Sequence, residues 1–145
     1  MKHFKLIPIL LIALFMSCED KPELNPEGFT EFGVDISGSW KINQVLQNDI
    51  DITNFFDFQS FSLQMNYENG QPSTFSLSDF SGPFSLKQNN GTWSFDDPIY
   101  PQKINFSDGT ILDIKGGVLS KGNQMTIETS LGCSSNTYTY LLTKS

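Results

Sequence analysis

Two adjacent carboxylates, Asp96 and Asp97, are the side chains whose type and spacing come nearest to a chemical site. Carboxylate oxygens coordinate Ca²⁺. Three further acids are available to help complete such a site: Asp49, Asp51 and Asp57. A glycosidase needs two acids that face each other across a cleft, whereas neighbours on a strand point to opposite faces. We therefore expect no catalytic pair and no metal, and instead a turn in which the Asp side chains bind local backbone and Pro98 fixes φ.

The same segment carries aromatic rings that suit a binding role. A Tyr or Trp ring offers an apolar face for stacking and a polar group for hydrogen bonds, and neighbouring carboxylates can bind sugar hydroxyls. The candidate ligand-binding residues are Trp93, Asp96, Asp97 and Tyr100. The alternative is that Tyr100, like Phe80, only covers an end of the fold.

Missing residue types exclude several classes of function. The chain has a single histidine, His3, and no arginine. Without histidine in the folded domain, Ser-His-Asp and Cys-His catalysis and His-ligated metal sites cannot be built. Without arginine and with a net charge of −7, the chain lacks the cations that bind phosphate backbones. We expect neither an enzyme, a cofactor nor a nucleic-acid partner.

The N-terminus predicts export. Two lysines, Lys2 and Lys5, precede an apolar run that ends at Met16 and is too short to span a bilayer. The pair Ser17-Cys18 then resembles the lipobox of bacterial lipoproteins, which implies cleavage after residue 17 and acylation of Cys18. An ordinary secretory signal is the alternative. Glu19-Asp20 is similar to the acidic export signal of Bacteroidota lipoproteins, which implies a surface-exposed, lipid-anchored protein in the bacterial outer membrane.

Three regions follow from this interpretation. Residues 1–17 form the signal peptide, residues 18–35 an acidic, proline-containing tether, and residues 36–145 the folded domain. Acylation of Cys18 would leave Cys133 without an intramolecular partner. Lone cysteines most often behave as small buried hydrophobes, so we expect Cys133 to be buried, with a reactive or intermolecular thiol as the alternative.

The domain must be built almost entirely from strands, because apolar and polar residues alternate with a period of two. The candidate strands are 38–46, 60–67, 73–78, 83–88, 91–96, 102–107, 110–115, 123–129 and 137–143. Three turn dipeptides separate them: Asn69-Gly70, Asn90-Gly91 and Asp108-Gly109. A short helical turn is expected near 53–58. An all-β antiparallel meander of eight to nine strands closes into a barrel or packs as a sandwich, and we expect the barrel.

The start of the first strand supports that choice. Gly38-Ser39-Trp40 resembles the Gly-x-Trp motif of lipocalin-like (calycin-type) barrels. In that fold the tryptophan closes one end of the barrel against a basic residue near the chain end, which implies Lys144 for that position here. Lipocalins more often use arginine, so the resemblance is one of fold.

A second resemblance covers more of the chain. Asp51-Ile52-Thr53 with Phe56-Asp57-Phe58, and the segment 90–101 (NGTWSFDDPIYP), are similar to a lipocalin-like lipoprotein family of unknown function in Bacteroidota. That family has no assigned catalytic residues, so the resemblance implies fold and location alone.

Two roles remain for such a domain. We expect a non-enzymatic accessory module that binds a glycan or an envelope protein through its rim. The alternative is a carrier of a small hydrophobic ligand, which needs a cavity of about 300 Å³ or more inside the barrel. The side chains expected to point inward are Phe61, Leu63, Met65, Phe84, Trp93, Phe95, Ile104, Phe106, Tyr138 and Tyr140.

Overall fold

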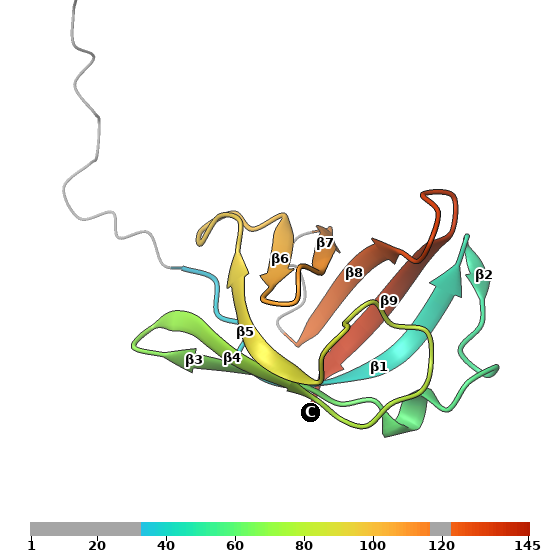
Figure 1. Cartoon of the computed structure of the whole chain (residues 1–145), viewed down its shortest axis with the longest axis horizontal. Helices are drawn as coiled ribbons and strands as arrows, with labels where there is room; N and C mark the ends of the chain where they lie inside the picture. Colours follow the sequence, from blue (N-terminus) through green and yellow to red (C-terminus); the bar gives the residue numbers. More distant parts are fainter. Residues whose placement is uncertain (1–32, 117–122) are drawn as a thin grey trace, which may run out of the picture. The chain divides into compact units, whose positions relative to one another are not determined.

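The computed structural model describes residues 33–116 and 123–145, and Figure 1 shows them as a strongly twisted antiparallel sheet. Its strands are β1 (Gly38–Gln47), β2 (Ile50–Asp51), β3 (Leu63–Glu68), β4 (Gln71–Leu77), β5 (Asn90–Phe95), β6 (Lys103–Phe106), β7 (Ile111–Lys115), β8 (Gln124–Ser130) and β9 (Thr137–Lys144). One 3₁₀ helix, η2 (Phe58–Ser60), follows a turn over 53–57, close to the expected helical turn. The expected signal peptide, the expected acylation site Cys18 and most of the expected tether lie outside the described residues.

The sheet closes into a barrel. The strand order is β2-β1-β3-β4-β5-β6-β7-β8-β9, and β1 also pairs with β9. Seven residue pairs join β1 to β9, and three join β1 to β3. Because β1 is hydrogen-bonded on both sides, the eight main strands form one ring, and β2 is an extra strand on β1. The expected all-β antiparallel barrel is confirmed, and two separate sheets are excluded.

Side chains fill the inside of the barrel. Along β8 and β9, buried residues alternate with more exposed ones, as a sheet with one dry face requires. Eight of the ten residues expected to point inward are buried: Phe61, Leu63, Met65, Trp93, Ile104, Phe106, Tyr138 and Tyr140. Phe84 and Phe95 are half-buried and pack against that core.

The registers define two barrel ends. The entry end holds the incoming segment 33–37, the β3–β4 turn and the β5–β6 loop 96–102. At this end Val34 and Ile36 are buried, and the Trp40 Nε1 donates to the Ile36 carbonyl at 2.9 Å. The core therefore already includes Val34, two residues ahead of the expected domain start.

The far end holds the β1–β2 turn, the segments 52–62 and 78–89, the β6–β7 turn and the β8–β9 loop. Segment 78–89 covers this end. The Phe84 ring packs against the rings of Phe61 and Tyr140, with centroids 4.9 and 5.1 Å apart. The Tyr140 hydroxyl donates to the Pro83 carbonyl at 2.7 Å. This end of the barrel is closed by side chains and by irregular backbone.

The expected strand 83–88 is wrong, because β4 pairs directly with β5 and leaves no place for a strand between them. The expected turn at Asn90-Gly91 is also wrong, since both residues lie in β5, where Gly91 pairs with Phe75. A side chain at Gly91 would place its Cβ 2.4 Å from the Ser107 Oγ. Close packing between strands therefore explains this glycine.

The other two turn dipeptides do form turns. Asn69 and Gly70 have φ of 54° and 75°, the left-handed pair of a type I′ turn. Only Gly109 of Asp108-Gly109 has a positive φ, 84°, so that turn is of another type.

Candidate functional site

The expected site at Asp96 and Asp97 forms a self-contained loop at the entry end. The Asp96 Oδ1 accepts hydrogen bonds from the backbone N–H groups of Asp97, Gln102 and Lys103 at 2.9–3.0 Å. Desolvation raises the pKa of Asp96, but the N–H donors, of which Lys103 contributes most, outweigh it and lower the pKa overall. This carboxylate holds the loop together.

Asp97 acts in the same way one residue later. Its Oδ1 accepts the N–H groups of Tyr100 and Ile99 at 2.9 and 2.8 Å, and these bonds lower its pKa. Both carboxylates therefore bind local backbone, as the turn interpretation expects. Asp51 binds Thr53 and Gln44 at the far end of the barrel, well away from this loop.

The two aromatic candidates differ in exposure. Trp93 is 3 % exposed, and its Nε1 donates to the carbonyls of Asn66 and Thr74. Tyr100 is 70 % exposed. Trp93 is thus part of the core, and ligand binding at this loop stays a prediction that depends on Tyr100.

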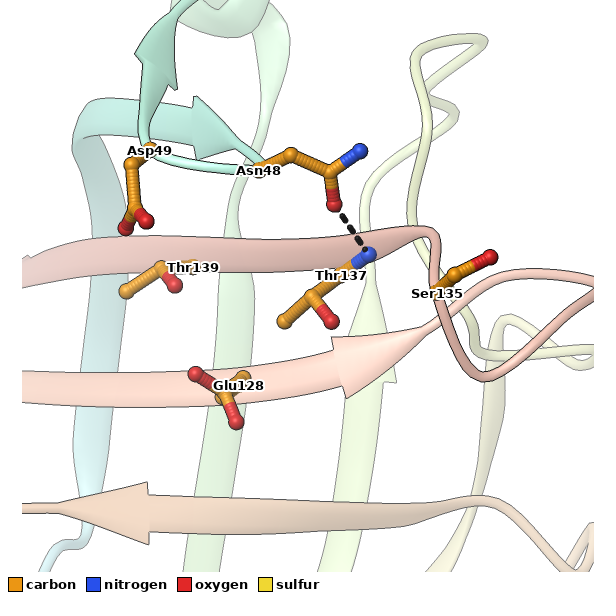
Figure 2. A pocket seen from close by; sticks show the side chains of 6 residues that line it. All are labelled: Asn48, Asp49, Glu128, Ser135, Thr137 and Thr139. Carbon is orange, nitrogen blue, oxygen red and sulfur yellow. Dashed lines mark hydrogen bonds between the residues drawn. The ribbon is translucent and has the colours of Figure 1, made fainter.

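A polar groove lies at the far end of the barrel. It encloses about 450 Å³ and opens to solvent. Figure 2 shows its six lining side chains: Asn48, Asp49, Glu128, Ser135, Thr137 and Thr139. They supply hydroxyls, one amide and two carboxylates, and we call this site the polar groove.

The floor of the polar groove comes from the outer face of β9. Thr137 and Thr139 alternate with the buried Tyr138 and Tyr140, so their side chains point outward. Glu128 lies beside this floor because it pairs with Thr139 across the β8–β9 ladder.

One wall is the β1–β2 turn. Asn48 and Asp49 have φ of 48° and 66°, a left-handed pair without glycine. Two bonds to Thr137 hold the turn: the Asn48 N–H donates to the Thr137 carbonyl, and the Thr137 N–H donates to the Asn48 Oδ1, both at 2.9 Å. With the turn held by these two bonds, the Asp49 carboxylate lies over the groove floor near Thr139 (Figure 2).

The β8–β9 loop ends the groove at Ser135 and also carries Cys133. The loop is fixed to β1 by the Gln47 side-chain amide, which donates to the Asn136 Oδ1 at 2.8 Å. Cys133 is free and exposed, so the expectation of a buried thiol is wrong. The cause is that Cys133 falls in a bend outside any strand. The Ser135 hydroxyl, 3.3 Å from the Cys133 Sγ, lowers the pKa of the thiol.

Sequence reasoning did not single out the polar groove. The alternation places Thr137 and Thr139 on the outer face of a strand, but their approach to Asn48 and Asp49 follows from the pairing of the first strand with the last. The consecutive polar residues Asn48-Asp49 between two apolar segments were the one available signal of a turn.

In the described part of the chain, no three His, Cys, Asp or Glu side chains come close enough together to hold a metal ion. Over the same residues, no helix has the length and apolar character needed to cross a membrane.

The molecule is a closed antiparallel β-barrel with a polar groove on its outer face. Comparison of the chain with protein-family profiles, curated proteins and solved structures found no match.

Proposed function

We propose that this protein is a non-catalytic, lipid-anchored cell-surface module that binds a glycan in the polar groove. The observation that carries the proposal is the groove's lining, which offers three hydroxyls, an amide and two carboxylates around an open hollow of about 450 Å³. Ligand sites span about 300–1,000 Å³ and are mostly apolar. A groove of this size that is lined by six polar residues suits a polyhydroxylated ligand.

The proposed location rests on two sequence resemblances: that of the domain to a lipocalin-like lipoprotein family of Bacteroidota, and that of Ser17-Cys18 to a lipobox, which implies acylation of Cys18. Fully extended, the chain from Cys18 to Gly33 spans at most about 50 Å. It joins the barrel at the entry end, where the Val34 N–H donates to the Pro98 carbonyl. The polar groove lies at the opposite, far end of the barrel.

A carrier of a small hydrophobic ligand is the second candidate. Segment 78–89 favours it, because this segment covers one end of the barrel without regular structure and inserts the half-buried Phe84. The Ser85 Oγ is buried there without a hydrogen-bond partner among the described residues. However, the aromatic and aliphatic core side chains would have to move before a ligand could enter the barrel. We therefore prefer the glycan-binding module.

Binding of the full-length chain, purified in detergent, to an immobilised glycan array tests the proposal. The matched variants are Thr139→Val, which removes a hydroxyl from the groove floor, and Thr143→Val, which changes an outer position of β9 that does not line the groove. We expect wild type and Thr143→Val to bind the same glycans and Thr139→Val to bind them about tenfold more weakly. Equal binding by both variants, or no glycan bound by wild type, would overturn the proposal.

A further inference from the structure

The charge of the polar groove narrows the class of sugar that it can accept. Two of its six lining residues, Asp49 and Glu128, are acidic, and none is a lysine or arginine. They come from different elements: Asp49 from the β1–β2 turn and Glu128 from β8. Figure 2 shows Thr139 between them on the groove floor.

Glu128 is already partly neutralised. The Lys115 Nζ lies 2.7 Å from its Oε1, and the Lys115 side chain does not line the groove. Asp49, in contrast, has no ion pair within the described residues. The groove therefore carries a net charge near −1, concentrated at Asp49.

We infer that the polar groove selects sugars that bear a protonated amine, with the ammonium bound beside Asp49 and the ring hydroxyls bound by the threonine and serine hydroxyls. This inference rests on the proposed glycan binding and names its ligand class. The groove contains what an amino sugar needs: Asp49 for the charge, and Thr137, Thr139 and Ser135 for the hydroxyls. An ammonium also donates to hydroxyl oxygens, so the floor can satisfy its remaining protons.

The same charges disfavour acidic sugars. A uronate or a sulfate in the groove would lie near the Asp49 carboxylate with no cation among the lining residues to compensate. Like charges that close together are unfavourable at any effective dielectric constant. Repulsion therefore weakens the binding of acidic glycans, while neutral ones keep only the hydroxyl contacts.

Titration calorimetry on the full-length chain can separate these cases with four disaccharides that share one linkage. The probes are the β-1,4 dimer of glucosamine, the same dimer acetylated on both nitrogens, the β-1,4 dimer of glucose, and a glucose dimer with one ring oxidised to the uronate. At about pH 6 the amines of the first probe are protonated. An exposed ion pair is worth up to about 1 kcal/mol, so we expect the amine dimer to bind about fivefold more tightly than the acetylated one.

The variant Asp49→Asn keeps the size of the side chain and removes its charge. We expect it to bind the amine and acetylated dimers equally while its affinity for the glucose dimer stays within about twofold. Asp57→Asn is the matched control, because Asp57 is an exposed acid of the 53–57 turn that does not line the groove. It should keep the fivefold preference.

The outcomes distinguish the two proposals. If wild type binds the neutral or acidic dimer as tightly as the amine, or if the preference survives in Asp49→Asn, the inference is wrong and glycan binding stands. If none of the four probes nor any glycan on the array binds, both the inference and the proposed function fall.

Discussion

The Lys144 Nζ lies 5.9 Å from the centroid of the Trp40 ring, and the two residues are direct partners in the β1–β9 ladder. Lysine over a tryptophan face is a cation–π arrangement. It occurs where the last strand meets the first, at the end of the barrel where Trp40 is buried. The resemblance of Gly38-Ser39-Trp40 to a lipocalin-like start implies this contact, and the geometry shows it.

Replacing Lys144 should weaken this closure. We expect Lys144→Ala to lower the free energy of unfolding by about 1 kcal/mol, through the lost cation–π contact and the lost packing of the lysine stem. Lys144→Arg should retain most of it. Chemical denaturation of the three proteins gives the comparison, and equal stability of wild type and Lys144→Ala would show that the contact contributes nothing.

A substitution at Gly38 should also affect stability, because Gly38 lies against the Lys144 side chain. The Gly38 φ of 124° is one that side chains rarely adopt, and an added Cβ would lie 2.5 Å from the Lys144 Cε. Gly38→Ala should therefore cost more than Lys144→Ala, about 2 kcal/mol or more. The double variant Gly38→Ala/Lys144→Ala should regain only the part of the lost stability that is due to the clash with the Lys144 side chain. Full recovery in the double variant would mean that backbone strain is absent.

The Tyr140 hydroxyl is expected to hold segment 78–89 in place. Burial of the Tyr140 hydroxyl raises the pKa of Tyr140. The hydroxyl donates its hydrogen bond to the Pro83 carbonyl, so the buried group has a partner. Tyr140→Phe keeps the ring and removes that bond, at a cost of about 1 kcal/mol. Hydrogen exchange should quicken in 78–89 and stay unchanged in β8. Uniform exchange across both regions would contradict a local role.

Stability should fall in acid, and Asp108 should account for part of the loss. Desolvation raises the pKa of Asp108, but the N–H groups of Thr110 and Lys87 outweigh it, so its folded pKa lies below the unfolded value. The stabilisation is thus present above about pH 4 and is lost as the pH falls through the folded pKa. Asp108→Asn should be less stable than wild type at pH 7 and should lose less on acidification. Parallel pH profiles would contradict this assignment.

Asp49→Gly should make the protein more stable, by about 0.5–1 kcal/mol, because glycine adopts the φ of 66° without strain. Thermal unfolding measures this directly, with Gly70→Asp in the β3–β4 turn as the reverse substitution, which should destabilise. A residue that lowers stability where glycine would fit is typical of sites retained for binding. Lower stability of Asp49→Gly would contradict the strain at this turn.

Sequence patterns predicted the strands wherever one face of a strand is dry, as in β8 and β9. They failed for 83–88, because Phe84, Ser85 and Leu86 alternate like a strand although β4 and β5 leave them no partner. The turn at Asp96 and Asp97 could be predicted, because Asp side chains accept hydrogen bonds from nearby backbone N–H groups and proline fixes φ. The polar groove could not, because the approach of the Asn48-Asp49 turn to Thr137 and Thr139 depends on the register of β1 with β9, and an expected barrel closure does not define that register.

That pairing also sets the order in which the chain can fold. Residue pairs such as Trp40 and Lys144 join the two extremes of the domain, and contacts of such long sequence separation slow folding. During synthesis, β1 emerges first, but its ladder with β9 can form only after the last strand has been made. The barrel, the Trp40 contact and the wall of the polar groove all become complete in the same late step, after the whole chain is available.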